Sequence, residues 1–220
     1  MENPYQPPSS SGSSPPPLVP GVAGLRDPRR LGVIAVSCLA LTTLVQIVDH
    51  LGRVFAHGVP IADLHLHDTY YVVADPPGGM EWLAMVVSIA ANVFYFLWVY
   101  RVAANAWLIK PEEMRMGPAM SVGCHFIPIA NIVMPYQALS GIARASCGTN
   151  AGVALWWTSW LILIVASMVF PFLPPATGGA HEVTAFEHAY LLWSIFTFIL
   201  SWRLVTRVSR AQAARCHQAT

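Results

Sequence analysis

W-V-Y-R-V-A-A-N at residues 98–105 and F-I-P-I-A-N-I-V-M-P-Y-Q at residues 126–137 belong to the stretch that decides the fold. They place an arginine, two asparagines, a glutamine and two prolines inside or beside strongly apolar sequence. Polar and helix-breaking residues are costly in hydrocarbon unless other groups of the protein satisfy them. We therefore expect an interrupted element of a membrane protein, whose polar groups either support the structure or serve a ligand.

The composition also indicates a lipid environment. Hydrophobic residues make up 55% of the 220 residues and charged residues only 10%, whereas soluble domains contain about 25% charged residues. The length suits one domain, and the formal net charge of +1 gives no reason to expect a nucleic-acid partner. The four cysteines form no C-x-x-C pair, which argues against a zinc ribbon or a redox motif.

Apolar runs divide the chain into three parts. The sequence predicts a disordered, Pro/Ser/Gly-rich cytoplasmic tail at residues 1–25, a membrane domain at 26–210 and a second cytoplasmic tail at 211–220. A helical run of about 18 apolar residues is long enough to cross the hydrocarbon. The predicted spans are residues 31–49, 82–100, 155–173 and 185–205.

A further apolar segment, residues 117–143, contains Pro128 and Pro135, and each proline removes a backbone hydrogen bond from a helix. If this segment crosses the membrane, six basic residues lie on each side. If it enters and returns, eleven are cytoplasmic and only Arg53 lies outside. The positive-inside rule favours the second arrangement, and five spans are the alternative.

The expected fold is therefore an all-α integral membrane protein. It has four transmembrane helices, a Pro-broken re-entrant or interfacial segment and both termini in the cytoplasm. The loop after the first span contains T-Y-Y-V-V at residues 69–73, which favours a short outer strand.

Four sequence patterns together carry a family resemblance: W-V-Y-R-V-A-A-N at 98–105, F-I-P-I-A-N at 126–131, P-Y-Q at 135–137 and the pair Trp156-Trp157. Over roughly residues 80–205 the chain resembles the bacterial multi-pass membrane proteins grouped as domain of unknown function 4328. The resemblance implies an integral membrane domain in a bacterium, and the expected location is the inner membrane. It implies no activity, because the family has none assigned.

The polar residues of the deciding stretch are the first candidate site. Arg101 and Asn105 are four residues apart and share a helix face, and a re-entrant segment returns Asn131 and Gln137 to a similar depth. The functional interpretation is a cluster that binds a lipid head group or a small anion. The structural interpretation is that Arg101 reaches the interface and the amides cap carbonyls freed by the prolines.

The outer loops suggest a second candidate site, because they hold six of the eight histidines. On a strand, His65 and His67 project from one face, and Asp68 follows them directly. With His50 at the end of the first span, these donors suit Zn²⁺ or Cu²⁺. The alternative is that the loop histidines are simply solvated. His125, in the broken segment, is expected to be a hydrogen-bonded packing residue.

Residues 67–74, H-D-T-Y-Y-V-V-A, also show a short local similarity to the large subunit of haem-copper oxidases. In that family haem-ligating histidines follow this segment, whereas this chain has Asp75, Pro76 and Pro77. The chain also has too few spans for that subunit. An oxidase is therefore not predicted.

No nucleotide-binding, nucleophile-elbow or zinc-protease motif is found in the sequence. The first hypothesis is a non-enzymatic membrane protein acting as scaffold, sensor or accessory subunit, with the Pro-rich tail available to a protein partner. The second is an outer-face metal-binding protein serving metal handling or oxidase assembly. The third is a small transporter that uses the broken segment.

Overall fold

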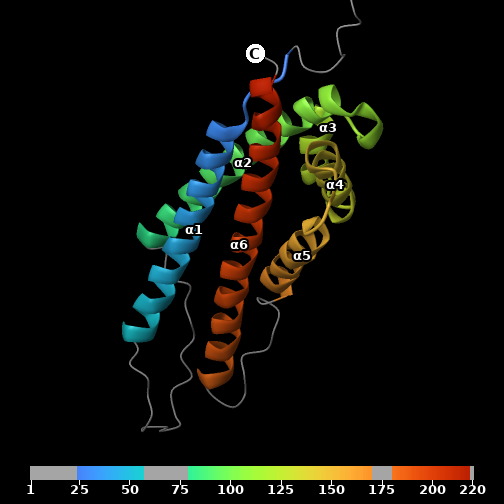
Figure 1. The fold of residues 1–220 in the computed structure, drawn as a ribbon. Coiled ribbons are helices and arrows are strands. Elements are labelled where there is room, and N and C mark those ends of the chain that lie inside the picture. The colour runs from blue at the N-terminus through green and yellow to red at the C-terminus, as the bar shows by residue number, and fades with distance from the viewer. Residues whose placement is uncertain (1–23, 57–78, 170–179, 219–220) are drawn as a thin grey trace, which may run out of the picture.

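The computed structural model describes residues 24–56, 79–169 and 180–218 of the chain. The helices are α1 (Arg29–Ala56), α2 (Gly79–Ile109), α3 (Pro118–Gly123), α4 (Met134–Cys147), α5 (Val153–Val169) and α6 (Ala180–Gln218), with single 3₁₀ turns η1 (Pro111–Glu113), η2 (Cys124–Phe126) and η3 (Ala130–Ile132) (Figure 1). No strand occurs within these ranges, which confirms the all-α prediction for them. The predicted outer strand and most of the N-terminal tail lie outside the described residues.

Three helices are long and apolar enough to cross a membrane. The qualifying stretches are Arg29–Gly52 of α1, Trp82–Ile109 of α2 and His188–His217 of α6. In the most apolar window of each, only 17% of the residues are buried inside the protein. Helix α5 is also apolar but has 17 residues, a length of about 25 Å. The bundle therefore turns most of its apolar surface outwards.

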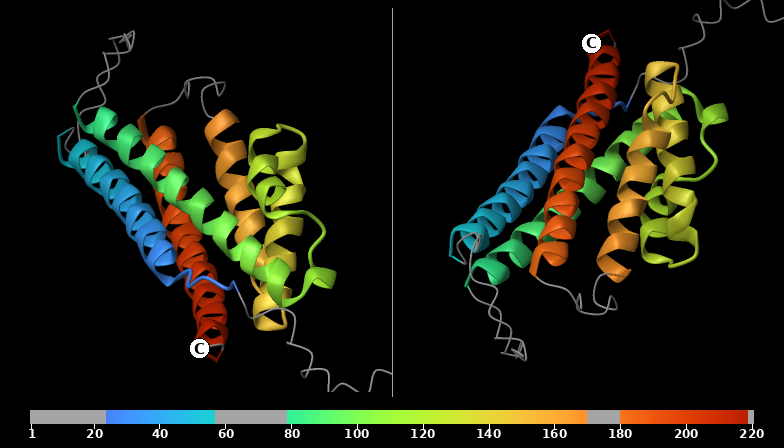
Figure 2. Two further views of the ribbon diagram at one scale, coloured as in Figure 1. Left: turned by 90° about the horizontal axis from the view of Figure 1, so that it is seen from above. Right: turned by 90° about the horizontal axis from the view of Figure 1, so that it is seen from below.

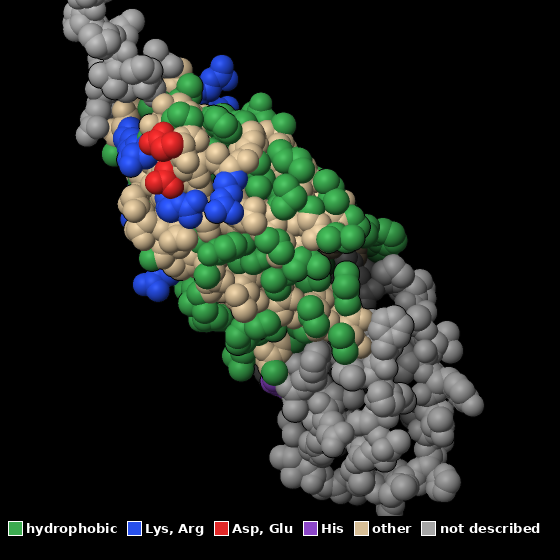
Figure 3. All heavy atoms as spheres, turned by 90° about the vertical axis from the view of Figure 1, so that its right-hand side faces the viewer, with side chains coloured by type: hydrophobic (Ala, Val, Ile, Leu, Met, Phe, Trp, Pro, Cys, Tyr) green, Lys and Arg blue, Asp and Glu red, His purple; other side chains and the backbone are tan. Residues whose placement is uncertain are grey.

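The exterior is covered by large apolar side chains on every long helix. Examples that are at least half exposed are Val33, Leu44, Val86, Ile89, Val165 and Leu192. Figure 3 shows apolar side chains over the middle of one face, with Lys and Arg gathered towards one end. Soluble monomers rarely expose an apolar surface of this extent. The surface is of the kind that contacts lipid chains.

The core is formed by residues of α1, α2, α4, α5 and α6, and the approach of α1 to it depends on a glycine. A Cβ atom on Gly32 of α1 would lie 2.6 Å from Ser209 Oγ, 3.3 Å from a Val205 methyl carbon and 3.4 Å from the Trp98 ring. Small residues allow membrane helices to approach closely. Gly32 thus lets α1 contact α2 and α6 at one point.

We expect Gly32→Ala to destabilise the protein by about 1–3 kcal/mol, because the added methyl group must push Ser209 or the helix aside. The measurement is unfolding of the purified protein in mixed micelles. Gly52→Ala is the matched control in the same helix, because its Cβ would meet nothing within 4 Å. If Gly52→Ala lowered the free energy of unfolding as much as Gly32→Ala does, the steric explanation would be contradicted.

A buried polar network joins four segments at one end of the bundle. Asn105 of α2 donates through Nδ2 to Gln212 Oε1 at 2.9 Å and to the Arg26 carbonyl at 2.8 Å. Its Oδ1 accepts from the Arg26 amide at 3.2 Å. Gln212 of α6 donates through Nε2 to the Val102 carbonyl at 2.9 Å and to Ser146 Oγ of α4 at 2.8 Å. Asn105 and Gln212 are 2% and 0% exposed, so the network fixes these helix ends to one another.

The same network shows the path of residues 110–147, here called the hairpin segment. Asn105 lies near the end of α2 and Ser146 near the end of α4, yet both bind Gln212. The chain therefore leaves one end of the bundle and returns to that end. Figure 2 shows α3 and α4 together at the edge of the bundle, beside α5.

Prolines interrupt the hairpin segment. Pro118 and Pro135 stand in the first turns of α3 and α4, where a missing amide hydrogen costs nothing. Pro128 lies between η2 and η3. The turns η2 and η3 form the tip of the hairpin segment. There the centre of the Phe126 ring lies 5.1 Å from that of the Phe96 ring of α2, and Trp157 Nε1 donates to the Ile132 carbonyl at 2.9 Å. Phe96 precedes Asn105 by nine residues, so the tip lies about 14 Å along α2 from the polar network.

Candidate functional site

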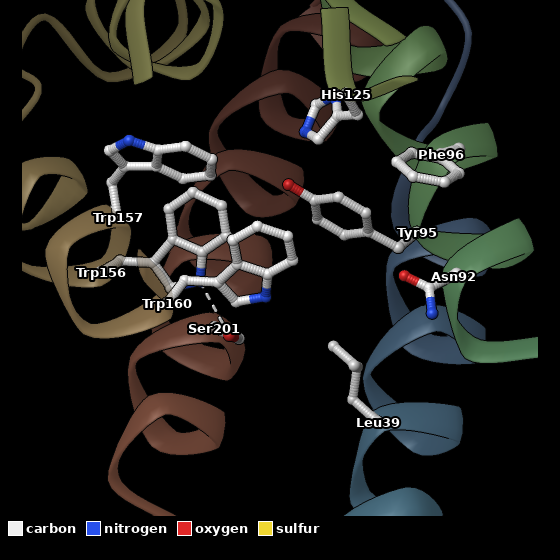
Figure 4. Close-up of a pocket in the computed structure, with 9 residues that line it drawn as sticks. All are labelled: Leu39, Asn92, Tyr95, Phe96, His125, Trp156, Trp157, Trp160 and Ser201. Carbon is white, nitrogen blue, oxygen red and sulfur yellow. Dashed lines mark hydrogen bonds between the residues drawn. The ribbon is translucent and has the colours of Figure 1, made fainter. Parts of the chain in front are cut away.

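A cavity of about 100 Å³ lies under the tip of the hairpin segment. Figure 4 shows aromatic side chains of α5 on one side and of α2 on the other, with His125 above and Ser201 of α6 below. The lining residues are Leu39, Asn92, Tyr95, Phe96, His125, Trp156, Trp157, Trp160 and Ser201. Five structural elements therefore contribute to one small chamber.

Two buried polar atoms at this cavity have no hydrogen-bond partner within the described part of the chain: Tyr95 Oη and His125 Nε2. Their ring centres are 6.1 Å apart with the planes nearly perpendicular, and Figure 4 shows the phenol oxygen pointing towards His125. An unpartnered buried polar group costs about 1–3 kcal/mol. Two such groups at one cavity indicate a binding site for a polar ligand.

The protonation of His125 follows from its other nitrogen. Nδ1 lies 3.2 Å from the Val122 carbonyl, which only accepts, so Nδ1 carries the hydrogen. In the neutral ring Nε2 then presents a lone pair. Tyr95 Oη supplies the complementary O–H donor.

The tryptophan wall is held rigidly. Trp156 Nε1 donates to Ser201 Oγ at 2.8 Å, and Ser201 donates in turn to the Thr197 carbonyl at 2.8 Å. The Trp157 and Trp160 rings stack with centres 5.3 Å apart. Because the indole N–H groups of Trp156 and Trp157 are already engaged, these two rings offer flat apolar surface to a ligand.

Among the described residues that line the cavity there is no Asp, Glu, Lys, Arg or Cys. Ser201, its one aliphatic hydroxyl, is bonded on both sides. The cavity therefore suits binding of a neutral molecule whose hydroxyl group donates to His125 Nε2 and accepts from Tyr95 Oη. Asn92 on its lining is exposed, so the cavity communicates with the outside of the bundle.

The four residues of the predicted polar cluster have different environments. Asn105 is fully engaged in the buried network. Arg101 and Gln137 are half-buried, and Asn131 has a buried Oδ1 without a partner. Within the described ranges no hydrogen bond joins any two of these four side chains. Asn105 thus makes its hydrogen bonds within the protein, and the ligand role of all four residues stays a prediction.

Of the predicted metal ligands, His65, His67 and Asp68 lie outside the described residues, as does the segment similar to the oxidase subunit. His50 is buried near the end of α1, and its ring contacts the ring of His188 from α6 with centres 4.5 Å apart. No group of three or more His, Cys, Asp or Glu side chains suited to a metal occurs among the residues that were described.

Sequence reasoning missed Tyr95 and assigned His125 only to packing. Tyr95 lies within an apolar run where a tyrosine normally indicates an interface. The hydrogen bond from His125 Nδ1 agrees with the packing interpretation, but its second nitrogen has no such bond. A histidine in an otherwise uncharged, proline-broken segment was the only available signal.

Comparison with known proteins gives one match. The domain of unknown function DUF4328 matches residues 74–210, which is more than half of the chain. No curated protein and no solved structure matches it. The matched region includes α2, the hairpin segment, α5 and most of α6, so it contains nearly the whole cavity lining. This confirms the resemblance seen at residues 98–105 and 126–137, and the chain belongs to the DUF4328 family.

Proposed function

We propose that the protein is a non-enzymatic integral membrane protein, a sensor or accessory subunit, that binds a small hydroxylated molecule in the cavity beneath the hairpin segment. The observation that carries the proposal is the pair of unpartnered atoms, Tyr95 Oη and His125 Nε2, at one aromatic cavity. A hydroxyl group bridges an acceptor nitrogen and a phenol donor, and the rings cover its apolar part.

The size of the cavity limits the ligand. A volume of about 100 Å³ is smaller than the roughly 150 Å³ of an engineered protein cavity that binds benzene. Only the hydroxyl-bearing end of a longer molecule fits, so the rest must extend past Asn92 towards the outside of the bundle. A short amphiphilic alcohol has this shape.

The proposed membrane arrangement has four spans, α1, α2, α5 and α6, with the hairpin segment entering and leaving on one side. Both termini lie on that side, which is the cytoplasmic face of a bacterial inner membrane. The shared partner Gln212 of Asn105 and Ser146 supports it. The positive-inside rule adds the orientation, because the basic residues flank this end.

The binding test is a titration of the detergent-purified protein with 1-hexanol, followed by tryptophan fluorescence. We expect a saturable change, because Trp156, Trp157 and Trp160 line the cavity. Tyr95→Phe and His125→Phe should each weaken binding about tenfold through loss of one hydrogen bond. Tyr95→Phe should fold as well as wild type, because its hydroxyl has no partner in the described structure.

Hexane has the same carbon number and no hydroxyl, so it separates specific binding from partition into the bundle. The proposal predicts that hexane binds wild type and Tyr95→Phe alike and more weakly than 1-hexanol binds wild type. Equal affinity of 1-hexanol for wild type and both variants would contradict it.

A further inference from the structure

On the basis of the proposed function, we propose that the hydroxylated ligand is a membrane-dissolved, long-chain lipid alcohol that enters the cavity sideways from the hydrocarbon, past Asn92. Three features of the molecule support this ligand class and this route. They are the depth of the cavity in the membrane, the packing on either side of it along the bundle, and a polar side chain that is exposed at its edge.

The cavity lies near the middle of the membrane-length helices. Its lining residue Tyr95 is 13 residues after the start and 14 before the end of the apolar stretch Trp82–Ile109. Ser201 is 13 residues after the start and 16 before the end of the stretch His188–His217. Thirteen helical residues span about 20 Å, and the hydrocarbon is about 30 Å thick. Both residues are therefore deep in the hydrocarbon layer, far from either aqueous phase.

Packed side chains lie on both sides of the cavity along the bundle. On the side towards the polar network, Trp98 is 0% exposed and donates to Ser209 Oγ at 2.9 Å. On the other side, the hydroxyl groups of Ser159 on α5 and Thr197 on α6 are hydrogen-bonded at 2.5 Å, and these residues are 1% and 4% exposed. A ligand that entered along the bundle would have to separate these contacts.

Asn92 marks an opening towards the lipid. It lines the cavity and is exposed, and its neighbours Ile89 and Val93 on α2 are 57% and 49% exposed. Figure 4 shows Asn92 and Leu39 at the edge of the cavity opposite the tryptophan side chains of α5. Asn92 Nδ2 donates to the Ser88 carbonyl of the same helix at 2.9 Å. A polar side chain that faces hydrocarbon in the middle of a span is costly and is typical of a functional site.

The polar atoms of the cavity select an alcohol from other lipids of the same length. A hydroxyl group has no hydrogen-bond partner in hydrocarbon, which is costly. In the cavity it can donate to His125 Nε2 and accept from Tyr95 Oη, which both lack a partner in the described part of the chain. The volume of about 100 Å³ limits only the hydroxyl-bearing end. The rest of a long-chain alcohol extends past Asn92 and stays among the lipid chains.

The test compares 1-hexadecanol with 1-hexanol, using the full-length protein in phosphatidylcholine nanodiscs and tryptophan fluorescence. The long chain of 1-hexadecanol keeps it in the bilayer, so its affinity is expressed per mole of lipid. We expect saturable binding of 1-hexadecanol to wild type and about tenfold weaker binding to Tyr95→Phe. Hexadecane, which lacks the hydroxyl group, should bind more weakly and equally to both proteins.

Asn92→Phe tests the route, because it narrows the opening and leaves Tyr95 and His125 in place. It should weaken the binding of 1-hexadecanol at least about tenfold by steric exclusion. Met85→Phe is the matched control, because Met85 is exposed two turns earlier on the same helix and is not among the described lining residues. This control should bind 1-hexadecanol as wild type does.

Two results would overturn the lipid source. One is binding of 1-hexanol but not of 1-hexadecanol to wild type, which would leave the proposed function standing with a water-borne alcohol as the ligand. The other is equal affinity of 1-hexadecanol for wild type and Asn92→Phe. If neither alcohol bound, the proposed function itself would fail, and the lipid source with it.

Discussion

Replacing Trp98 by alanine is expected to destabilise the protein by about 3–5 kcal/mol, the range for removing a buried Trp or Phe side chain. Trp98 is a core residue with 0% exposure, and it lies beside Gly32 of α1 and Ser209 of α6. Its Nε1 donates to Ser209 Oγ at 2.9 Å. The substitution leaves a large cavity beside Gly32. It also removes the N–H group that donates a hydrogen bond to the buried hydroxyl of Ser209. Equilibrium unfolding in mixed micelles measures the change.

Trp202→Ala is the matched control for Trp98→Ala. Trp202 is on α6 and is 50% exposed, so its loss should cost far less. Trp98→Phe should fall between wild type and Trp98→Ala, because it keeps one aromatic ring but loses the hydrogen bond and part of the buried volume. Similar losses for Trp98→Ala and Trp202→Ala would show that burial in this core does not stabilise the fold.

Replacing Gln212 by alanine is expected to cost about 3 kcal/mol, because several buried groups lose a partner together. Its amide accepts from Asn105 and donates to Ser146 Oγ and to the Val102 carbonyl. The loss should also loosen the attachment of α4 to α6. Hydrogen exchange along α4 and α6, measured beside unfolding, tests both expectations.

Gln137→Ala is the control for Gln212→Ala, since Gln137 is half-buried and no side-chain hydrogen bond is formed by it within the described residues. Its substitution should change the free energy of unfolding by less than about 0.5 kcal/mol. Asn105→Ala should resemble Gln212→Ala, and the double variant should cost less than the sum of the two, because both belong to one network. Full additivity would contradict the network.

The sequence predicted the helical class and the interrupted segment for direct physical reasons. Apolar runs of membrane length indicate helices, because hydrocarbon leaves the backbone no other partner than itself. Pro128 and Pro135 indicate breaks, and the structure places the η2–η3 tip and the start of α4 at these residues. Both signals are local, so reading them required no knowledge of tertiary contacts.

The polar network could not be predicted from local sequence patterns. Asn105 was conspicuous in an apolar run, but its partner Gln212 lies 107 residues away. Gln212 also stands after the last apolar run, in a stretch that resembles a cytoplasmic tail. The helix continues to Gln218 because Gln212 and Ala213 are buried against other helices. Only the tertiary arrangement shows that a polar residue there belongs to the core.

The cavity and the histidine pair were hidden for the same reason. Tyr95 and Trp156 look like ordinary aromatic residues of membrane helices, and their ring centres come within 6.4 Å only in the fold. His50 was predicted as a metal ligand together with residues of the outer loop. Its contact with His188 depends on the packing of α1 against α6, which no sequence pattern encodes.

The proposed four-span topology and the position of the cavity both depend on the path of the hairpin segment. The measurement to make is therefore on which side of the membrane each end of this segment lies. Single cysteines are introduced at exposed positions at the start of the segment (Glu112→Cys), just after it (Thr149→Cys) and near the end of α6 (Arg210→Cys). The starting variant lacks the native cysteines Cys38, Cys124, Cys147 and Cys216. A membrane-impermeant thiol reagent is applied to right-side-out and to inverted vesicles.

We expect all three cysteines to react only in inverted vesicles, which places both ends of the hairpin segment and the end of α6 on the cytoplasmic side. Labelling of Glu112→Cys and Thr149→Cys from opposite sides would show that the segment crosses the membrane. It would contradict the four-span arrangement and the re-entrant hairpin above the cavity.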